Sequence, residues 1–547
     1  MKKWLRKFST VTMATLLATG SLATSVFVSA QEDEEFETGT LTEFPLTEET
    51  VHMSLMAPGT GMAEWADMPT LQVYEEMTNI SWEYITPPMS DFGTRMNLAF
   101  ASGDLPDIIY GAGSGTLTRG MEVDYGRQGI LIPLEGYLAE YAPNFTALTE
   151  ENPDILRSIT APDGHIYSLP FLSGGPTGIW PTGPLWYNGA WLDALGVEEV
   201  PTTVDDFYDL LVRMRDEDPN GNGQADEIPF TDVALEYSRP YILTAFGMKA
   251  FGIEEVDGVV RYAPVTDNYR AYLEFMAKLY SEGLLDQETF IQANEQKKAK
   301  GQNNQIGLFQ DWFSFFTLGG TEDEAVNNPM FHPLTSEWAP EPISPASPQL
   351  QTGVFAITNQ AENPELAVQW VDYFYSPDGA AFLNQGPEGA MWIWSENEAG
   401  EPVKVFNTEN VDITNTEEYR GQITPDYGIP VPKGTFNVAG VHVDPNETDA
   451  SAFSDFIRDE TEAKMQPYAE VPFPVTYLTT DEQDIIVTMQ TDLNTFIVEQ
   501  EARFITGVQE INDDTWAQYV NTINSMGIDD YVMVHQQAYD RWVQAGE

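Results

Sequence analysis

The sequence predicts an α/β protein built from two or more lobes. Short apolar runs alternate with amphipathic helical patterns along most of the chain, which is typical of α/β architectures. The 547 residues exceed what one ordinary hydrophobic core can organise, so more than one lobe is expected. A hydrophobic content of 42% with 12% aromatic residues can build large cores and argues against a disordered chain.

The strands are predicted from short apolar or alternating runs. Residues 81–85 alternate between apolar and polar side chains, and the run that begins at Asp107 is continuously apolar until Gly111. The predicted strands are 51–56, 81–85, 107–111 and 306–309.

The helices are predicted from apolar residues spaced three or four positions apart. Thr203 is expected to cap one helix, and Asn363-Pro364 is expected to begin another with proline in its first turn. Gly283 is expected to end a third helix. The predicted apolar faces are Leu71 and Tyr74; Phe207, Leu210, Leu211 and Met214; Tyr269, Leu273, Met276 and Tyr280; and Leu366, Trp370 and Phe374.

The N-terminus has the pattern of an export signal. Lys2, Lys3, Arg6 and Lys7 precede an apolar stretch over 11–22, and small residues at 28–30 form a cleavage site. We therefore expect residues 1–30 to be an export signal and 31–48 to be a flexible acidic leader. The apolar stretch is too short to span a bilayer, and no later run reaches about 18 apolar residues, so a soluble exported protein is expected.

The absence of cysteine excludes disulfides and thiolate chemistry. Residues 17–21 resemble a bacterial lipobox, but Ser21 stands where the lipidated cysteine belongs. The sequence therefore does not support a lipid anchor. An altered lipobox, release from the cell and a periplasmic location all stay open.

The charge of the chain is strongly negative. Residues 1–30 hold four of the 25 basic residues and none of the 86 acidic ones, so the remainder carries a formal charge of −65. Such self-repulsion is tolerated at high ionic strength, which favours a saline or alkaline habitat. Nucleic acid is excluded as an expected partner, because phosphate binding needs basic surface.

Residues 218–227 have the pattern of a calcium-binding loop. Oxygen-bearing side chains alternate along it and Gly223 stands at the sixth position, where such a loop turns sharply. Pro229 occupies the twelfth position, which holds a bidentate glutamate in an EF-hand, so Glu227 would have to take that role. A polar turn without a metal is the alternative. The predicted ligands of a structural Ca²⁺ are Asp218, Asn220, Asn222, Gln224 through its carbonyl, Asp226 and Glu227.

The sequence contains no recognisable catalytic motif. The five histidines are scattered, and there is no HExxH pair, nucleophile elbow, Walker A loop or dinucleotide fingerprint. A pair of carboxylates working as in a glycosidase stays possible on composition, because the chain has 86 acidic residues. Any chosen pair is more readily explained as solvated surface.

The chain resembles the extracellular solute-binding proteins of carbohydrate ABC transporters, in the large lipoprotein branch that includes alginate-binding proteins. The resemblance covers most of the chain. It rests on segments such as Ala-Ser-Gly-Asp-Leu-Pro-Asp-Ile at 101–108 and Asp-Gly-His-Ile-Tyr-Ser-Leu-Pro at 163–170. The other matching segments are 129–134, 141–144, 191–196, 386–389, 504–507 and 538–542, together with the loop 218–227.

This resemblance implies a type II periplasmic-binding-protein-like α/β fold, with two lobes joined by hinge strands and a helical C-terminal region. It implies an N-lobe formed by 49–170 and about 350–390. It implies a C-lobe formed by 171–349 and about 391–547, which carries the calcium loop. A monomer that delivers its ligand to ABC transporter permease subunits is expected.

Sugar rings stack on aromatic side chains, and their hydroxyls bind planar polar groups. Several of the 13 tryptophans lie in loops where the strands of α/β lobes end, which is where ligands bind. Core packing is the alternative for each of them. The predicted ligand contacts are Trp65, Tyr110, Trp180, Asp311, Trp312, Glu388 and Trp392.

The function that the sequence predicts is capture of an oligosaccharide between two lobes and its delivery to a membrane permease, without bond breaking. A secreted polysaccharide-degrading hydrolase or lyase that uses carboxylates is the alternative from another class. A receptor subunit for a sensor kinase or an adhesion system would share the same fold.

Overall fold

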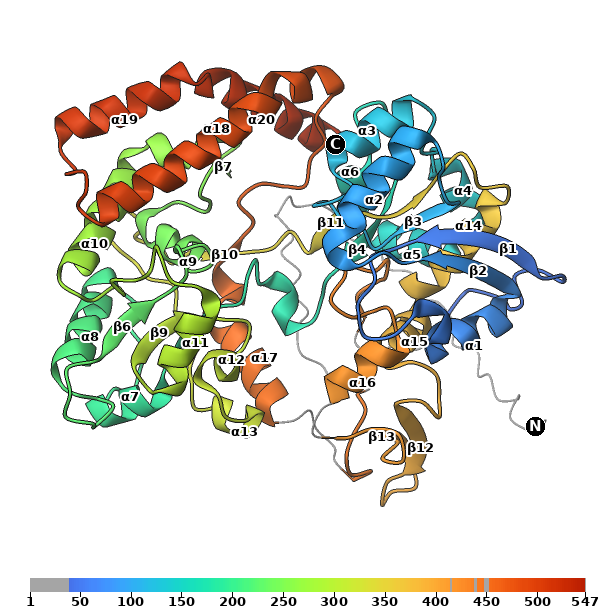
Figure 1. Ribbon diagram of the computed structural model, residues 1–547, viewed down its shortest axis with the longest axis horizontal. Helices are drawn as coiled ribbons and strands as arrows, with labels where there is room; N and C mark the ends of the chain where they lie inside the picture. Colours follow the sequence, from blue (N-terminus) through green and yellow to red (C-terminus); the bar gives the residue numbers. More distant parts are fainter. Residues whose placement is uncertain (1–38, 414–415, 437–439, 447–451, 547) are drawn as a thin grey trace, which may run out of the picture. The chain divides into compact units, whose positions relative to one another are not determined.

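The computed structural model describes residues 39–413, 416–436, 440–446 and 452–546 (Figure 1). The predicted export signal and the leader up to residue 38 lie outside the described residues. Two lobes, each built around its own sheet, make up the described chain.

The first lobe contains a five-stranded sheet in the order β2-β1-β3-β11-β4. Strands β1, β2 and β3 are parallel, whereas β11 runs antiparallel to β3 and to β4. The strand bounds are β1 Val51–Met56, β2 Ile80–Ile85, β3 Ile108–Tyr110, β4 Leu169–Leu172 and β11 Leu350–Ile357. The three strands predicted in this part of the chain are therefore confirmed.

Both faces of this sheet are covered by helices. Successive residues of a strand point to opposite faces, so neighbouring residues belong to different cores. Leu55 and Tyr110 belong to one apolar core with residues of α1, α4, α5, α14 and α15. Met56 and Ile109 belong to another core with residues of α2 and α3. The helix bounds are α1 Pro69–Thr78, α2 Met89–Ser102, α3 Arg119–Arg127, α4 Glu135–Tyr141, α5 Pro143–Glu151, α6 Pro153–Ile159, α14 Pro364–Asp372 and α15 Pro377–Gln385.

The second lobe contains a three-stranded sheet in the order β5-β9-β6. Strand β9 (Ile306–Gln310) is parallel to β6 (Ile228–Thr231) and antiparallel to β5 (Leu185–Tyr187). The core around this sheet includes residues of the helical C-terminal region. The remaining bounds are α7 Gly189–Leu195, α8 Val204–Asp216, α9 Arg239–Leu243, α10 Asp267–Ser281, α11 Asn294–Gln302, α12 Ser314–Leu318, α13 Glu322–Ala325, α17 Ala452–Lys464, α18 Thr480–Ile505, α19 Asp513–Ser525 and α20 Ile528–Gln544.

Three small two-stranded sheets and several 3₁₀ turns complete the described chain. The hairpins are β7 Ile253–Val256 with β8 Val259–Tyr262, and β12 Trp392–Glu396 with β13 Pro402–Phe406. Strands β10 (Ser344–Pro345) and β14 (Ala469–Glu470) pair in parallel. Helix α16 spans Thr416–Ile423. The 3₁₀ turns are η1 Trp65–Asp67, η2 Pro176–Ile179, η3 Thr244–Phe246, η4 Ala263–Val265, η5 Tyr373–Tyr375 and η6 Gln466–Tyr468.

The residues predicted to begin helices lie at the starts of α8 and α14. The Thr203 hydroxyl accepts a 3.1 Å hydrogen bond from the Asp206 N–H at the start of α8. The predicted apolar face of that helix is buried. Helix α14 begins with Pro364 in its first turn, although Asn363 makes no side-chain cap bond.

Two segments differ from the sequence-based boundaries. Within the predicted leader, the N–H of Leu41 donates a 2.8 Å hydrogen bond to Asn144, and Phe44 packs edge-on against Tyr373 with 5.2 Å between ring centroids. Residues 39–48 therefore pack on the first lobe. Their acidic composition did not indicate these contacts.

The segment that follows α15 is expected in the C-lobe, but its contacts are with the first lobe. Val431 is buried in the same core as Leu383, and the Gly434 N–H donates a 3.1 Å hydrogen bond to the Phe374 carbonyl. The chain joins the core of the second lobe at α17, where Phe453 and Ile457 are buried.

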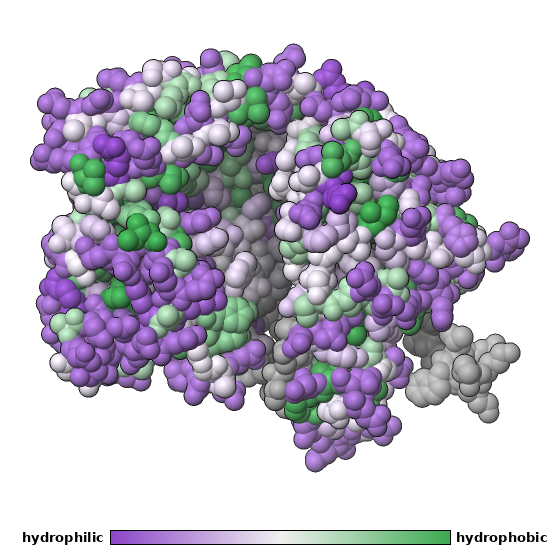
Figure 2. Space-filling view, viewed as in Figure 1, coloured by the Kyte–Doolittle hydropathy of each residue, from purple (hydrophilic) through white to green (hydrophobic). Residues whose placement is uncertain are grey.

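Polar side chains cover most of the face shown in Figure 2, and apolar residues are scattered over it in small groups. This agrees with the acidic composition of the chain. Within the described ranges, none of the helices combines the length and the hydropathy that a bilayer crossing requires.

Candidate functional site

The carboxyl ends of β6 and β9 lie at one edge of the second sheet, because the two strands are parallel. Strand β5 runs the other way, so the residues before it reach the same edge. Loops that leave the carboxyl ends of parallel strands form the ligand site in open α/β sheets. We call the region at the carboxyl end of the central strand β9 the β9 edge. It is defined by Trp180, Asp311, Trp312, Phe313 and Phe316.

Trp312 is the side chain at the β9 edge that is best placed to meet a ligand. It is 50% exposed, whereas Trp180 beside it is only 3% exposed. The two indole rings are 6.3 Å apart at an angle of 30°. Trp312 thus presents an open ring, and Trp180 supports it from the core.

Further aromatic side chains extend this surface. Phe316 is 43% exposed and packs edge-on against Phe313, with 5.7 Å between the ring centroids. Phe313 also contacts the ring of Trp180 at 6.1 Å. Phe316 is not among the predicted ligand contacts, although the dense aromatic run 312–316 could have indicated it.

Asp311 holds the turn that carries Trp312. Its carboxylate accepts hydrogen bonds from the Trp312 N–H at 2.8 Å and from the Thr317 hydroxyl at 2.7 Å. Its backbone carbonyl accepts a 2.9 Å hydrogen bond from the indole of Trp186. The ammonium of Lys298, on α11, lies 3.8 Å from the carboxylate and adds a positive charge to the turn.

Trp65 and Tyr110 lie together in the core of the first lobe. Each is 1% exposed, and their rings meet edge-on with centroids 5.6 Å apart. Burial raises the pKa of the Tyr110 hydroxyl, and the charge of Asp426 raises it further. Both side chains are therefore enclosed in the packing of the first sheet.

Glu388 and Trp392 lie near the hairpin β12–β13. Glu388 is exposed, and Trp392 is 9% exposed. The Lys404 ammonium lies 4.4 Å from the centroid of the Trp392 ring, so this ring is already covered by a cation. Trp394 on the same hairpin is 51% exposed and is not among the predicted ligand contacts.

In the first lobe, the chain that leaves β3 runs against β11, where the Gly113 N–H donates a 2.8 Å hydrogen bond to the Gly353 carbonyl. Gly113 has a φ of +68°, and a Cβ atom there would lie 2.8 Å from the side-chain nitrogen of Gln351. A residue larger than glycine would therefore displace Gln351. Nearby polar groups come from a loop that contains no predicted ligand contact, in which the Lys433 ammonium lies 2.6 Å from the Asp426 carboxylate.

The predicted calcium loop joins α8 to β6 and folds back on itself. Asp218, Gly221 and Gly223 all have a left-handed backbone, with φ values of 49°, 70° and 72°. The Asp226 carboxylate accepts hydrogen bonds from the side-chain amides of Asn220 at 3.1 Å and Asn222 at 2.9 Å. The Asp218 carboxylate accepts a 3.1 Å hydrogen bond from the Gly223 N–H.

The chemistry of this loop fits a hard divalent cation. Oxygen Oε1 of Glu227 is buried and has no hydrogen-bond partner. Burial raises the pKa of Glu227, and the charges of Asp226 and Asp218 raise it further. A partly buried carboxylate with one partnerless oxygen, beside two other carboxylates, is what a bound Ca²⁺ would neutralise.

Carboxylate side chains alone do not supply a complete set of metal ligands in this loop. Across the described ranges, no group of three or more His, Cys, Asp or Glu side chains is close enough to hold a metal ion. The amide oxygens of Asn220 and Asn222 and the Gln224 carbonyl would have to contribute. Calcium accepts such mixed oxygen ligands.

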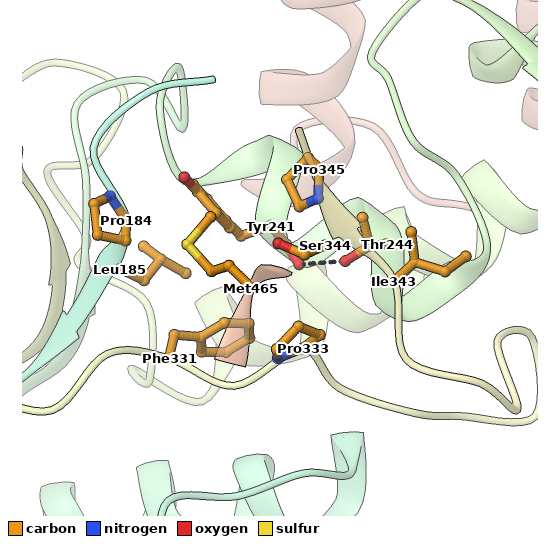
Figure 3. A pocket seen from close by; sticks show the side chains of 10 residues that line it. All are labelled: Pro184, Leu185, Tyr241, Thr244, Phe331, Pro333, Ile343, Ser344, Pro345 and Met465. Carbon is orange, nitrogen blue, oxygen red and sulfur yellow. Dashed lines mark hydrogen bonds between the residues drawn. The ribbon is translucent and has the colours of Figure 1, made fainter. Parts of the chain in front are cut away.

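The cavity drawn in Figure 3 is too small for a saccharide, whereas a wider cavity of about 470 Å³ lies beside α7, between Leu192, His332 and Lys464. The cavity in Figure 3 lies between Leu185, Tyr241, Phe331, Ser344 and Met465 and has a volume of about 10 Å³. In Figure 3 the Thr244 hydroxyl donates its hydrogen bond to the Tyr241 carbonyl, at 2.9 Å. This volume is near that of one water position and is far below what a sugar ring needs.

A family model of bacterial extracellular solute-binding proteins matches residues 58–381 of the chain. The chain belongs to this family. Members bind solutes rather than transform them, so the predicted binding function is confirmed and the enzymatic alternative is not supported.

Individual proteins resemble the chain over nearly its whole length. It is 27% identical to the fructooligosaccharide ABC transporter substrate-binding protein FusA of Streptococcus pneumoniae over 557 residues, which cover 98% of this chain and 99% of FusA. A structure of FusA in complex with kestose has a TM-score of 0.71 and 24% identity, and covers 91% of this chain and 100% of that one.

Further structures are similar in fold. The alginate-binding protein AlgQ2 without calcium has a TM-score of 0.65 and 21% identity, with 90% of this chain and 99% of that chain covered. Another FusA structure is of an EF-hand mutant in complex with fructo-nystose. The predicted two-lobed α/β fold with a helical C-terminal region is confirmed by these structures.

Proposed function

We propose that this family member is the substrate-binding component of an ABC importer and that it captures an oligosaccharide. The observation that carries the proposal is the half-exposed Trp312 ring at the carboxyl end of β9, backed by Trp180 and flanked by Asp311. A flat aromatic surface beside a carboxylate suits the apolar face and the hydroxyls of a sugar. The similarity to a fructooligosaccharide-binding protein supports the same ligand class.

The proposed contacts differ in part from those selected from the sequence. Trp312 would stack on a sugar ring, and Asp311 would accept hydrogen bonds from its hydroxyls. Trp180 would act from behind by holding Trp312. Glu388 and Trp392 stay predictions, and Trp65 and Tyr110 are left out because they are enclosed.

The recognition chemistry requires no bond breaking. Stacking removes apolar area from water, and each hydroxyl exchanges water for a protein partner. Lobe closure around the ligand would bring groups of the first sheet to the other side of the sugar. A closed complex of this kind would then be recognised by permease subunits, with the binding protein acting as a monomer.

We further propose that the loop 218–227 binds a structural Ca²⁺. The partnerless oxygen of Glu227 supports this, together with the convergence of Asn220 and Asn222 on Asp226. The bound ion would neutralise the local negative charge and tie the end of α8 to the start of β6. It would stabilise the second lobe because it binds the folded loop preferentially.

Calorimetric titration of the purified protein tests the proposed function. Kestose, nystose and other neutral oligosaccharides would be titrated at high ionic strength, with and without added calcium. Binding with recovery of the intact saccharide, checked by mass spectrometry, is expected. Cleaved products would contradict the proposal, as would the absence of binding to every saccharide tested.

A further inference from the structure

Helix α11 lies beside the segment that carries Trp312. Lys297 of this helix is 2% exposed, and its ammonium donates a 2.5 Å hydrogen bond to the backbone carbonyl of Gln310. Gln310 is the last residue of β9, two positions before Trp312. The buried cation therefore holds the point at which the chain leaves the sheet.

Two neighbours of Lys297 on α11 hold the same segment. The Lys298 ammonium lies 3.8 Å from the Asp311 carboxylate and 5.8 Å from the centroid of the Phe316 ring. A Cβ atom at Gly301 would lie 2.5 Å from the Thr317 carbonyl oxygen, so glycine allows α11 to pack directly on the end of α12. Lys297, Lys298 and Gly301 of α11 thus contact the segment 310–317 at several points along the helix.

A buried ammonium is costly, so the contact of Lys297 needs a reason. Moving an ion out of water is unfavourable unless other groups compensate for the lost hydration. Burial lowers the pKa of Lys297, and the charges of Asp232 and Asp311 oppose this shift. An apolar side chain of similar length would fill the space without this cost but could not hold the Gln310 carbonyl.

The opposite side of the same turn is also held. The side-chain amide of Gln310 donates a 3.0 Å hydrogen bond to the Gly183 carbonyl. The Trp186 indole binds the next carbonyl, that of Asp311. With Lys297 on one carbonyl and Trp186 on the next, the backbone has little freedom before it reaches Trp312.

We propose that Lys297 is a positioning residue for saccharide binding, which acts by fixing the Gln310 carbonyl and thereby the orientation of the Trp312 ring. The inference rests on the proposed function, because it assumes that Trp312 meets the sugar. It assigns no direct contact between Lys297 and the ligand, since Lys297 is enclosed.

Lys297→Met and Lys300→Met form a matched pair for the test. Lys300 lies on the same helix, but its ammonium binds Asp286 at 2.8 Å and Gln292 at 2.9 Å, away from the Trp312 turn. The full-length variants would be titrated with kestose. We expect Lys297→Met to raise the Kd at least about fivefold and Lys300→Met to leave it unchanged.

A double-mutant cycle separates positioning from general structural damage. If Lys297 acts through Trp312, Lys297→Met has no further effect on the Kd in a Trp312→Ala background. An equal effect in both backgrounds would overturn the inference. If Lys297→Met does not fold, Lys297→Gln takes its place, because it keeps one N–H donor and most of the side chain.

A spectroscopic measurement makes the inference testable without a ligand. The protein would be labelled with 5-fluorotryptophan, and the fluorine signal of Trp312 would be assigned with Trp312→Phe. We expect this signal to shift or broaden in Lys297→Met and to stay in place in Lys300→Met.

The two possible failures are distinguishable. If kestose does not bind the wild type, the proposed function fails for this saccharide, whereas the fluorine signal still tests whether Lys297 fixes the orientation of Trp312. If Trp312→Ala weakens binding while Lys297→Met changes neither the Kd nor the signal, the inference is wrong and the proposed function stands.

Discussion

The hydroxyl of Ser168 donates a 2.6 Å hydrogen bond to the buried carboxyl group of Glu122. Tyr477 donates a second one at 2.9 Å, and Ser168 in turn accepts a 2.9 Å hydrogen bond from the N–H of Gly353. Gly353 lies in β11 where the register with β4 shifts, and has a φ of +72°. Glu122 on α3 therefore binds the chain together at β4, at β11 and at the segment before α18.

Glu122→Gln is expected to reduce the pH dependence of stability. Burial raises the pKa of Glu122 to about 7, although the hydrogen bonds from Ser168 and Tyr477 and the charge of Arg119 oppose the shift. The folded state thus holds this proton more tightly than the unfolded state does. Its contribution to the free energy of unfolding is present below pH ~4.5 and is lost as the pH rises through about 7. The loss is on the order of 3 kcal/mol at most.

Chemical denaturation of the wild type and of Glu122→Gln between pH 5 and pH 9 measures this contribution. Glutamine cannot ionise, so the variant should lose less stability than the wild type over this range. Asp124→Asn changes a partly exposed carboxyl group of the same helix and serves as the control. Parallel stability curves for the wild type and Glu122→Gln would refute the assigned role.

Removal of calcium is expected to lower the melting temperature. A ligand present at about 100 times its Kd stabilises the folded state by about 2.7 kcal/mol, so EDTA should lower Tm by several degrees. Differential scanning calorimetry with calcium, with magnesium and with EDTA measures the effect. Asp226→Asn and Glu227→Gln should abolish the calcium-dependent shift.

Glu217→Gln is a suitable control for the calcium loop. Glu217 is exposed, immediately precedes the loop and pairs with Arg213 at 3.1 Å. Its replacement removes one negative charge from the neighbourhood but no proposed ligand. An equal loss of the calcium effect in Glu217→Gln would indicate that general charge, rather than coordination, causes the stabilisation.

The sequence predicted local features better than spatial ones. The strands, the Thr203 cap and the burial of Trp370 follow from period and capping, which are properties of neighbouring residues. Glycine, aspartate and asparagine at fixed spacing likewise pointed to the loop at 218–227. The lobe assignment of the segment after α15 could not be read in this way, because Val431 and Phe374 meet only in the folded chain.

Ligand contacts were the hardest features to predict. Trp65 and Trp312 both stand in loops near strand ends, yet one is 1% exposed and the other 50%. Their difference depends on which helices pack over each loop, and no pattern in the sequence encodes that exposure. Lys298 was missed because its contact with Asp311 joins a helix to a turn 13 positions away.

Trp312→Ala is expected to weaken saccharide binding by about tenfold or more, which corresponds to about 1.4 kcal/mol. The substitution removes the exposed ring from the β9 edge and leaves Trp180 in the core, so little change in stability is expected. Trp338→Ala is the matched control, because Trp338 is 38% exposed in another loop of the second lobe. Equal Kd values for both variants would place the saccharide elsewhere.

Arg239 and Glu501 form a buried ion pair that joins α9 to the C-terminal helix α18. Their side chains are 8% and 0% exposed and approach within 2.6 Å. The Tyr272 hydroxyl donates a further hydrogen bond to Glu501 at 3.2 Å. The helical C-terminal region is thereby fixed to the second lobe by charge as well as by apolar contacts.

Arg239→Met is expected to destabilise the protein by about 3–5 kcal/mol, because it leaves the Glu501 carboxylate buried without its cation. Replacing both partners, as in Arg239→Met with Glu501→Leu, should recover much of this loss, since no isolated charge then remains. Arg270→Met breaks the exposed contact with Glu274 and should cost less than about 1 kcal/mol. Urea denaturation of the four proteins measures these differences. A double variant as unstable as Arg239→Met would mean that lost packing, rather than the unpaired charge, dominates, because only the charge effect is reversed by removing the partner.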